Sequence, residues 1–489
     1  MRTLTLGLAF IAVLVPFVAR ADGPYLGNGI KSGEATQSTI IIWTRLTTMA
    51  DISGDGIPWP LGIPKHIGED YTFGGPQIAE GHTLNDMAYA LLGAPGEVRV
   101  SYWPEETSNF STTTNWSAVS PEADFTHQFR LTGLQPNERY RCVVEARSPK
   151  GNAPSSRVQG TFRTAPAIDT VTPVTFVVVT GQAFWRRDDD KNGHKIYPKM
   201  AKLDPNFFVH TGDIVYYDKA RPWSITKPLA RYKWNRMYAL PYQRTFHNRV
   251  ASYFLRDDHD TWQNDCWPAM SNNKMGELTY TEGVEIFFEQ VPAPDREKPY
   301  RTIRWGRDLQ IWLSEGRDYR SANTDPDGPG KTIWGAEQMV WFKKTVTESD
   351  ATFRVLISPT PVVGPDRKKG KNDNHANAAF AHEGNKLRAF MAEQKNMIVI
   401  CGDRHWQYAS IDPRTRLREY CSGPTSDVHA GGFRQDLREP MHQYLNIIGG
   451  FLSCTSERRA GEPVLVIRHH DVAGDVVNED VLTQGVIIR

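Results

Sequence analysis

Three apolar runs in this chain stop abruptly at acidic residues. The stretch 209–218 contains Gly212-Asp213, the stretch 254–260 contains Asp257-Asp258-His259, and the run 396–401 leads into Gly402-Asp403-Arg404-His405. Continuous apolar runs of this length predict buried strands. Each of these strands would deliver its carboxylates to the carboxyl edge of a sheet.

Each acidic motif alone has an ordinary structural explanation. A Gly-Asp pair after a strand is typical of a turn or a helix cap, and an isolated Asp-Asp-His is typical of a solvated loop. The repetition favours another interpretation, because carboxylates gathered at one edge repel each other unless cations lie between them. Asp, Tyr and His side chains suit di- or trivalent cations. The sequence therefore predicts a metal site.

The first third of the chain has the pattern of short, half-buried strands. Such patterns occur at Thr39–Thr44, Glu97–Tyr102 and Tyr140–Glu145, with turn residues between them. The segment Leu134–Tyr140 resembles the Leu-x-Pro-x-x-x-Tyr corner of a fibronectin type III-like sandwich. We expect a fibronectin III/Ig-like β-sandwich domain over residues 22–166, with the Gly- and Pro-rich stretch Asp51–Pro95 as a surface insertion near the mouth of the site.

Strand and helix patterns alternate after a linker at Ile168–Pro173. A strand is expected at Val174–Thr180, helices at His194–Leu203, Trp334–Thr347 and Leu387–Met391, and a final hairpin at Pro463–His469 with Asp475–Val481. This order predicts an α/β domain over residues 174–489. The segment Pro365–His375, rich in Lys, Asp and Asn, predicts a mobile loop without a catalytic role.

Composition excludes some partners. The 489 residues are 39% hydrophobic and 23% charged, which is typical of a globular protein of two or three domains. Lys and Arg number 57 against 56 Asp and Glu, so the formal net charge is only +1. With so small a net charge, the protein has no overall electrostatic field that would attract nucleic acid or a membrane surface. Specificity must come from a local site.

The first 21 residues have the pattern of a signal peptide. Arg2 precedes the apolar run Leu6–Val18, and Ala19-Arg20-Ala21 is a small-x-small cleavage site before Asp22. A membrane anchor is the weaker alternative, because the run is shorter than the ~20 residues that span a bilayer. We expect export to the periplasm or medium by the general secretory route, since there is no twin arginine. No other segment approaches transmembrane length.

Five cysteines in an exported chain leave at least one thiol unpaired. Cys142 and Cys401 lie in strand patterns and are expected to be buried thiols. Cys421 and Cys454 form the most plausible disulfide pair, on the basis of their loop-rich surroundings.

The three acidic motifs, in their order, resemble those of the alkaline phosphatase D (PhoD-like) family of metallophosphatases. The family motifs are of the types Gly-Asp-x-x-Tyr, Asp-Asp-His and Gly-Asp-x-His. Here the first matches Gly212, Asp213 and Tyr216, the second Asp257, Asp258 and His259, and the third Gly402, Asp403 and His405. The resemblance covers nearly the whole chain after Ala21. It implies an α/β metallophosphatase core of two packed sheets flanked by helices.

The resemblance also implies two or more metal ions, calcium together with iron or another transition metal. Asp213 is the best candidate to bridge two cations. Tyr216 would bind iron(III) as a phenolate, although without the resemblance a packed aromatic side chain is the simpler interpretation. Asp258 would complete the coordination of the second ion. Asp403 and His405 would add ligands from the last strand, where Asp favours an oxygen-loving cation such as calcium.

Other residues are candidates for catalysis and substrate binding. His259 would hold a proton for the leaving alkoxide, and its alternative is a structural role beside the metals. Arg256 and Arg186 would supply the fixed cationic groups that bind the free oxygens of a phosphate ester. Gln182 would face the same region.

One position departs from the family pattern. The first catalytic strand of the family ends in Ser-Cys-Gln, and the cysteine thiolate is taken to bind iron. This chain has Thr180-Gly181-Gln182, so Gly181 replaces the cysteine ligand. A thiolate is a soft, strongly binding ligand, and its loss predicts a weaker or different first metal.

The sequence therefore predicts an exported phosphoric ester hydrolase of the alkaline phosphatase or phosphodiesterase type, with phosphate esters as its substrates. One alternative is a sulfate ester hydrolase on the same fold, because sulfate is isosteric with phosphate. The other is a catalytically impaired, metal-poor binding protein. The intact acidic motifs argue against that last alternative.

Overall fold

Two β-sheets packed face to face carry the strand ends that the sequence singles out. The computed structural model describes residues 23–67, 70–73, 75–107, 111–271, 274–293, 295–367 and 371–484. The predicted signal peptide lies outside these ranges. Within them, no helix combines the length and the apolar character needed to cross a membrane.

The first sheet has nine strands among the described residues. Their order is β23 (Val476–Thr483), β22 (Glu462–His470), β21 (Phe451–Arg459), β11 (Val174–Val179), β12 (Phe207–His210), β13 (Ser252–Phe254), β1 (Ile30–Gly33), β2 (Ile40–Arg45) and β8 (Thr126–Leu131). Strands β11, β12 and β13 are parallel, so their carboxyl ends lie at one edge. The predicted first catalytic strand and the predicted final hairpin are both confirmed.

The second sheet has seven strands in the described part of the chain. Their order is β14 (Arg301–Trp305), β15 (Leu309–Leu313), β16 (Phe353–Ser358), β17 (Met397–Cys401), β19 (Arg418–Ser422), β18 (Gln407–Ile411) and β20 (His442–Asn446). The central strands β15, β16, β17 and β19 are parallel. The carboxyl end of β17 therefore brings Asp403 to the same region as the ends of β12 and β13.

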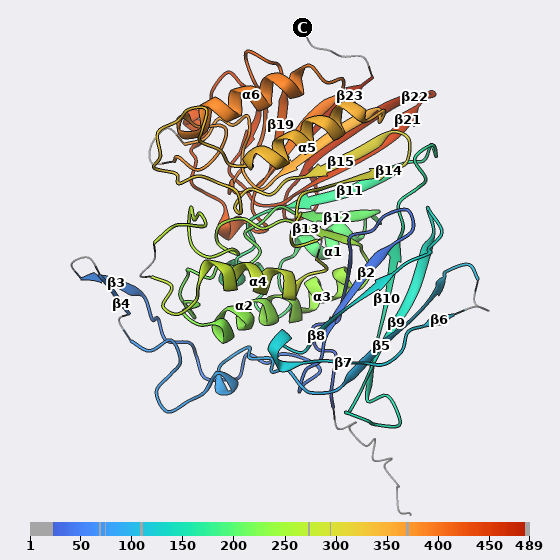
Figure 1. Cartoon of the computed structure of the whole chain (residues 1–489), viewed down its shortest axis with the longest axis vertical. Coiled ribbons are helices and arrows are strands. Elements are labelled where there is room, and N and C mark those ends of the chain that lie inside the picture. The colour runs from blue at the N-terminus through green and yellow to red at the C-terminus, as the bar shows by residue number, and fades with distance from the viewer. Residues whose placement is uncertain are drawn as a thin grey trace, which may run out of the picture.

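Helices cover the outer faces of both sheets (Figure 1). Helices α1 (Ile196–Ala201), α2 (Lys227–Ala239), α3 (Pro241–His247) and α4 (Tyr280–Gln290) pack on the first sheet, and α5 (Gly335–Glu348) and α6 (Ala381–Ala392) pack on the second. Helices α1, α5 and α6 confirm the three predicted helices. The two-sheet α/β core is thus the predicted one.

Burial on both faces explains why the strands are apolar without alternation. In β11, Phe176 and Val178 belong to the core between the sheets, whereas Val177 and Val179 belong to the core under the helices. In β17, Ile398 and Ile400 face the first sheet, and Val399 packs under α5 and α6. Two-sided burial of this kind fixes the strand register, because a slip by one residue would exchange the two cores.

The N-terminal third is β-rich, as predicted. Strands β10 (Ser156–Arg163), β9 (Arg139–Arg147), β5 (Glu97–Pro104) and β6 (Thr112–Thr113) form a separate sheet, with β7 (Ser117–Ala118) beside β5, and this sheet packs on β1, β2 and β8. Those three strands also belong to the first sheet of the catalytic part. One sheet therefore runs through the boundary that we expect near residue 166.

A glycine makes this continuity possible. Gly33 of β1 lies beside Ser252 of β13 in a parallel pairing. A Cβ atom at Gly33 would lie 2.3 Å from the Ser252 carbonyl oxygen and 2.8 Å from the Pro292 side chain. Because no other residue fits this approach, Gly33 determines how the N-terminal strands join the core.

Described residues of the predicted insertion Asp51–Pro95 contact residues beside the predicted site. The insertion contains β3 (Pro64–Ile67), β4 (Asp70–Phe73) and a short 3-10 turn, Leu84–Asp86. The Tyr89 ring packs edge-on against Phe184, at a centroid distance of 5.2 Å, and the Tyr89 hydroxyl accepts a hydrogen bond from Arg187. This placement agrees with an insertion near the mouth of the site.

The predicted disulfide is wrong. Cys421 lies in β19 of the second sheet and Cys454 in β21 of the first, and all five cysteines are buried free thiols in the structure. Both residues belong to strands rather than to the loops that we expected. Both thiols pack in the core as small apolar side chains.

Candidate metal centre

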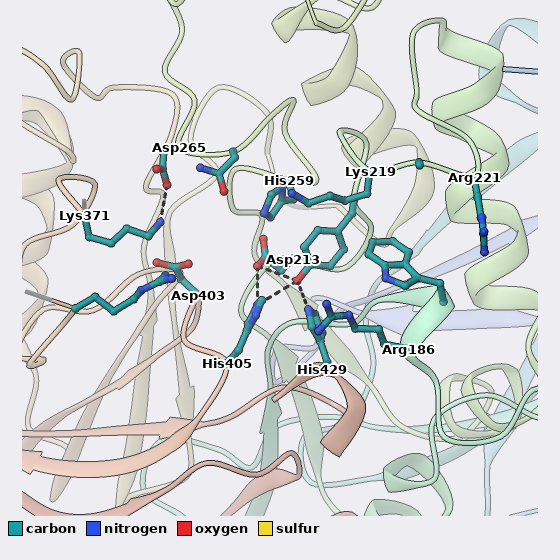
Figure 2. Close-up of a pocket in the computed structure, with 15 residues that line it drawn as sticks. Arg186, Asp213, Lys219, Arg221, His259, Asp265, Lys371, Asp403, His405 and His429 are labelled. Carbon is teal, nitrogen blue, oxygen red and sulfur yellow. Dashed lines mark hydrogen bonds and ion pairs between the residues drawn. The ribbon is translucent and has the colours of Figure 1, made fainter. Parts of the chain in front are cut away.

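A cavity of about 820 Å³ opens where the carboxyl ends of β12, β13 and β17 meet (Figure 2). Six of the nine site residues predicted from the sequence line it: Arg186, Asp213, Tyr216, His259, Asp403 and His405. Asp258 lies beside the cavity wall, and Arg256 and Gln182 lie elsewhere. The structure thus brings together residues that are more than 200 positions apart.

Glycines allow these strand ends to converge. Gly212 has φ +113°, and a Cβ atom there would lie 2.6 Å from the Cβ of Asp257. A Cβ atom at Gly402 would lie 2.5 Å from Thr211 Oγ1 and 2.6 Å from the Pro359 carbonyl oxygen. The glycine of each Gly-Asp pair is therefore needed for close approach, which frees the aspartate to face the cavity.

Asp213 is an uncompensated buried carboxylate. It is only 1% exposed, and its Oδ1 has no hydrogen-bond partner within the described ranges. Burial, together with the charges of Asp258 and Asp257, raises the pKa of Asp213 well above its usual range. A buried acid surrounded by other acids is stable in its ionised form only when a cation is close.

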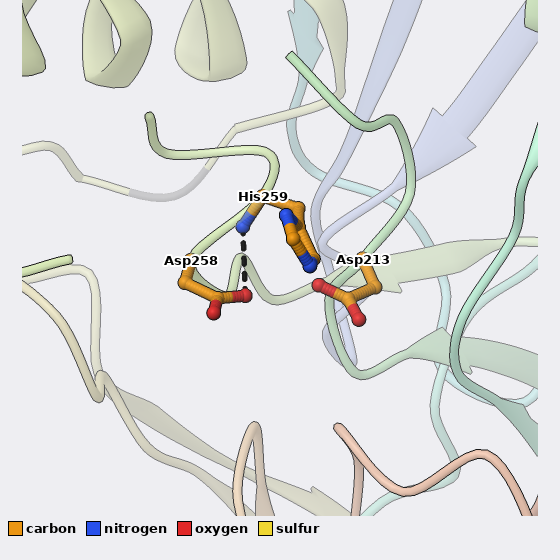
Figure 3. A group of neighbouring side chains, drawn as sticks. All are labelled: Asp213, Asp258 and His259. Carbon is orange, nitrogen blue, oxygen red and sulfur yellow. Dashed lines mark hydrogen bonds between the residues drawn. The ribbon is translucent and has the colours of Figure 1, made fainter. Parts of the chain in front are cut away.

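Asp213, Asp258 and His259 offer ligand atoms that all lie within 4.8 Å of one another (Figure 3). Although burial opposes its ionisation, His259, Arg317 and Lys371 hold the pKa of Asp258 below its usual range. Asp258 also accepts hydrogen bonds from the backbone N–H groups of His259, at 2.8 Å, and Asp265, at 2.6 Å. Asp258 is thus held as a carboxylate next to Asp213.

The orientation of His259 is fixed by Asp218. His259 Nδ1 lies 2.6 Å from Asp218 Oδ1, so the other ring nitrogen faces Asp213 and the cavity (Figure 3). Burial lowers the pKa of His259, but the charges of Asp218 and Asp258 outweigh it, and the net shift is upward. Without a cation beside it, the imidazole is therefore readily protonated.

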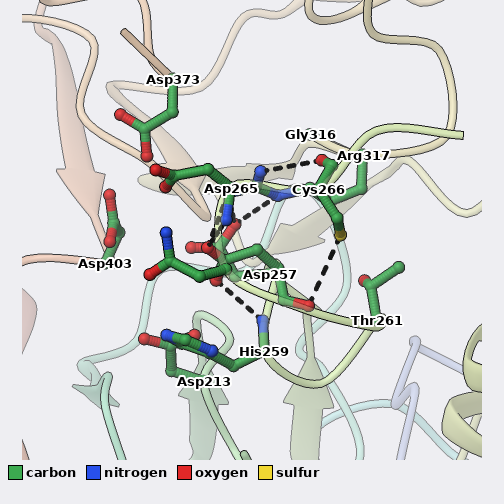
Figure 4. A network of polar contacts seen from close by, with 12 residues as sticks. Asp213, Asp257, His259, Thr261, Asp265, Cys266, Gly316, Arg317, Asp373 and Asp403 are labelled. Carbon is green, nitrogen blue, oxygen red and sulfur yellow. Dashed lines mark hydrogen bonds and ion pairs between the residues drawn. The ribbon is translucent and has the colours of Figure 1, made fainter. Parts of the chain in front are cut away.

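Asp257, the first acid of Asp-Asp-His, faces away from the cavity. Arg317 donates from Nε to Asp257 Oδ1 at 2.7 Å and from Nη1 to the Cys266 carbonyl oxygen at 3.2 Å (Figure 4). Both charged side chains are fully buried. This ion pair anchors the loop that presents Asp258 and His259.

Two predicted residues lie behind the site rather than in it. Arg256 is 1% exposed, pairs with Asp318 and with Glu315 at 3.2 Å, and donates to Thr261 at 3.1 Å. The side chain of Gln182 is fully buried and accepts a hydrogen bond from the Tyr197 hydroxyl. Neither side chain reaches the cavity, because each is committed to a buried partner.

Two residues of the segment Pro365–His375 lie in the cavity wall, whereas its lack of a catalytic role stays a prediction. Arg367 and Lys371 line the cavity, and Lys371 Nζ lies 2.8 Å from Asp265 and 3.4 Å from Asp373. Arg404 holds the segment through Asp366, at 3.1 Å. These ion pairs hold the described residues on either side of 368–370 against the cavity.

Three polar side-chain atoms surround the Tyr216 hydroxyl. Its oxygen lies 3.2 Å from Asp213 Oδ2, 3.2 Å from His405 Nε2 and 3.3 Å from His429 Nε2. His405 Nε2 is in turn 3.6 Å from Asp213 Oδ2. The carboxylate, the phenol and the two imidazoles therefore converge on one point (Figure 2).

Several residues of the cavity were not predicted. Besides the two basic residues of segment 365–375, they include Lys219, Arg221, Asn264, Asp265 and His429. His429 ends a short 3-10 turn and the others lie in loops, and no local pattern marks them. For Lys219, Asn264 and Asp265, proximity in sequence to the acidic motifs is an available signal.

The donors fit the predicted kind of metal site. One end of the cavity offers imidazole, phenol and carboxylate groups, and the other end is rich in carboxylates, from Asp258, Asp265 and Asp403. Asp403 is buried beside other acids, which raises its pKa in spite of Arg404. The first donor set suits a transition metal, and the second suits a hard cation such as calcium.

Family comparisons agree with this geometry. Residues 176–443 match the model of a family described as PhoD-like phosphatase, and residues 14–166 match that of the PhoD-like phosphatase N-terminal domain. A search of curated proteins finds no match.

Solved structures show the same fold. A structure of PhoD superposes with a TM-score of 0.69 at 16% identity, covering 94% of this chain and 89% of that chain. A purple acid phosphatase, PPD1, from yellow lupin (Lupinus luteus) seeds superposes with a TM-score of 0.62 at 13% identity, covering 94% of this chain and 75% of that one. At such low identity these structures establish the fold alone.

Proposed function

The chain belongs to the PhoD-like phosphatase family, and we propose that it is an exported metal-dependent hydrolase of phosphate esters. The observation that carries this proposal is the buried Asp213 carboxylate, which has one oxygen without a hydrogen-bond partner among the described residues and four neighbouring acids. Such a group is stable where it bridges cations. Export follows from the signal-peptide pattern before Asp22, and the mass of the exported protein tests it.

Asp213, Tyr216 and His405 would hold one ion, and Asp258 and Asp403 the other, with Asp213 between them. When bound, the ions would polarise the phosphoryl group and activate water. His259, oriented by Asp218, would donate a proton to the leaving alkoxide. Arg256 would act as a positioning residue, because it fixes the loop after β13 without touching the cavity.

Basic side chains around the cavity would bind the free oxygens of the substrate. Arg186, Lys219, Arg221, Arg367 and Lys371 all line it. Lys371 is closest to the acids, and burial of its ammonium is outweighed by Asp403, Asp373 and Asp265, which raise its pKa. A ring of fixed positive charges around a metal pair suits an anionic ester.

A second cavity favours diesters over monoesters. It measures about 470 Å³, has aromatic walls that include Trp59, Tyr89 and Phe184, and shares Trp185 and Arg221 with the metal cavity. An organic group on the far side of a phosphodiester would fit there, whereas a phosphate monoester has no second group. The insertion after Thr48 supplies two of these aromatic side chains.

The proposal is tested by metal analysis and a panel of chromogenic mono-, di- and sulfate esters. We expect bound metal, with hydrolysis of diesters at least as fast as that of monoesters. Asp213→Ala should lose metal and activity together, whereas Asp350→Ala, which changes a surface carboxylate, should keep both. Full metal content and turnover in Asp213→Ala would falsify the site. Preference for sulfate esters, or absence of metal in the wild type, would support the alternative functions.

A further inference from the structure

The Tyr216 hydroxyl has one proton, and a carboxylate oxygen and two imidazole nitrogens lie around it. Asp213 Oδ2, His405 Nε2 and His429 Nε2 all lie 3.2–3.3 Å from its oxygen. One hydroxyl can donate to only one of them. Buried lone pairs that converge in this way repel one another unless a cation lies between them.

His429 has only one way to use its ring nitrogens. Its Nδ1 lies 3.0 Å from the carbonyl oxygen of Gly181, and a carbonyl can only accept, so Nδ1 carries the proton. Nε2 is then an acceptor, and it points at the Tyr216 hydroxyl. A ring N–H donated to a backbone carbonyl is also the usual way in which proteins orient a metal-binding histidine.

The position of His429 is built into the fold. The residue is 4% exposed and ends a 3-10 turn, Asp427–His429, that packs against the end of β11. Its ring lies 4.1 Å from the His405 ring and 5.5 Å from the Tyr216 ring, between centroids. Trp185 covers Tyr216 from the outside, at a centroid distance of 5.4 Å.

Gly181 leaves this space to the two imidazoles. It has φ +57°, and a Cβ atom there would lie only 3.1–3.2 Å from the His405 ring. Strand β11 therefore contributes a carbonyl group to the centre and no side chain. Any further ligand on this side must come from another element, and His429 is the donor that faces it.

We infer that His429 is a metal ligand, and that the first ion is held by Asp213, Tyr216, His405 and His429. The inference rests on the proposed function. Ligands at ~2.1 Å from one ion lie ~3.0–3.4 Å apart along the edges of an octahedron or tetrahedron, which matches the contacts around Tyr216. Two imidazoles, a phenolate and a carboxylate select a borderline transition metal such as iron or zinc, without any thiolate.

The test compares metal binding by His429→Gly, His442→Gly and the wild-type protein, each stripped of metal and titrated with iron(III) or zinc(II) alone. His442 is the matched control, because it is buried at 3% exposure and does not line the cavity. We expect His429→Gly to bind the first ion about 100-fold more weakly or worse. Its iron form should also have a shifted phenolate charge-transfer band.

Imidazole rescue separates ligation from a structural role. Added imidazole should restore the affinity and the absorption band of His429→Gly, because the free ring can enter the space that the substitution leaves. A change of fold would not be repaired in this way, and circular dichroism of the metal-free variants checks the fold directly.

The outcomes separate this inference from the proposed function. If the wild-type protein binds no metal, the proposed function fails as well. If the wild-type protein binds metal and His429→Gly binds it with the same affinity and the same band, only the role of His429 is overturned. If His429→Gly is weakened and imidazole does not restore it, His429 is a structural residue and the inference is also overturned.

Discussion

His259 sits between two carboxylates that decide which of its nitrogens faces the cavity. Asp218 takes one side of the ring at 2.6 Å, and the other side faces Asp213. The same geometry suits a proton donor and a metal ligand. The two roles predict different metal contents for a variant that lacks the ring.

We expect His259→Ala to keep its metal and to lose ~10²–10⁴-fold in kcat, as is usual for a general acid. Asp218→Asn should lose less, because it removes the orienting charge but keeps the ring. Metal content and kcat of both variants are the measurements. Loss of metal from His259→Ala would instead identify the ring as a ligand.

At the scale of residues, the sequence was informative where a side chain follows its strand directly. Asp213, Asp258 and Asp403 each come within a few residues of an apolar run, so strand burial and strand direction suffice to place them. His429, in a 3-10 turn, and Lys371, in a loop, reach the cavity only through the packing of distant segments. Arg256 is also next to a strand, but its ion pairs with Glu315 and Asp318 turn it away from the cavity.

The turn at residues 362–364 leads into the cavity wall and is held by one buried carboxylate. The fully buried carboxylate of Glu419 in β19 accepts hydrogen bonds from the N–H groups of Val362 at 2.6 Å, Val363 at 2.9 Å and Gly364 at 2.7 Å. Tyr408 donates a fourth, at 2.9 Å. This turn opens the segment that carries the basic residues of the cavity.

We expect Glu419→Gln to lower the free energy of unfolding by about 2–4 kcal/mol, because the amide NH₂ would face backbone N–H donors in a buried place. It should also raise KM, since the turn leads to Lys371. Denaturant unfolding and steady-state kinetics measure the two effects. The exposed Glu393→Gln is the control. Equal stability of the two variants would show that the turn does not need the carboxylate.

At the scale of elements, periodicity predicted the strands and helices well, and it failed for contacts between them. The helices near residues 194, 334 and 387 and the closing hairpin formed as expected, because their apolar positions match the local period. The pairing of Cys421 with Cys454 failed, because no pattern shows that the two strands belong to opposite sheets. The register of β1 beside β13 was equally invisible in the sequence.

The whole molecule has one sheet that includes N-terminal and C-terminal strands. Because β1 pairs with β13, the N-terminal part covers an edge that would otherwise be open. We expect a chain that starts at Val174 to be insoluble or unfolded, and the full chain to show a single calorimetric transition. Two separate transitions, or a stable catalytic fragment, would restore the boundary near residue 166 as a true domain border.

One histidine links the two sheets and makes their packing sensitive to acid. His469 in β22 donates from Nε2 to the Tyr408 carbonyl in β18, at 3.0 Å, while its Nδ1 accepts from Asn478 at 3.2 Å. Both nitrogens are committed in the neutral ring. Burial lowers the pKa of His469 from 6.5 to about 4.

Between pH 6.5 and 4, the unfolded chain binds a proton at His469 that the folded chain excludes. Stability from this group is therefore complete above pH 6.5 and falls as the pH falls towards 4, by about 3 kcal/mol in all. His469→Gln should reduce the slope of unfolding free energy against pH in this window. Urea unfolding at a series of pH values measures it, and an unchanged slope would contradict the assignment.

The pairing of Gly33 with Ser252 also has a consequence for the time order of folding. Strand β1 leaves the ribosome long before its partner, and closing a loop of roughly 200 residues costs about 5 kcal/mol of chain entropy. The N-terminal strands must therefore wait for the middle of the chain. A protein of such high contact order is expected to fold slowly, and chaperones that keep the early strands apart from other chains would matter most during this interval.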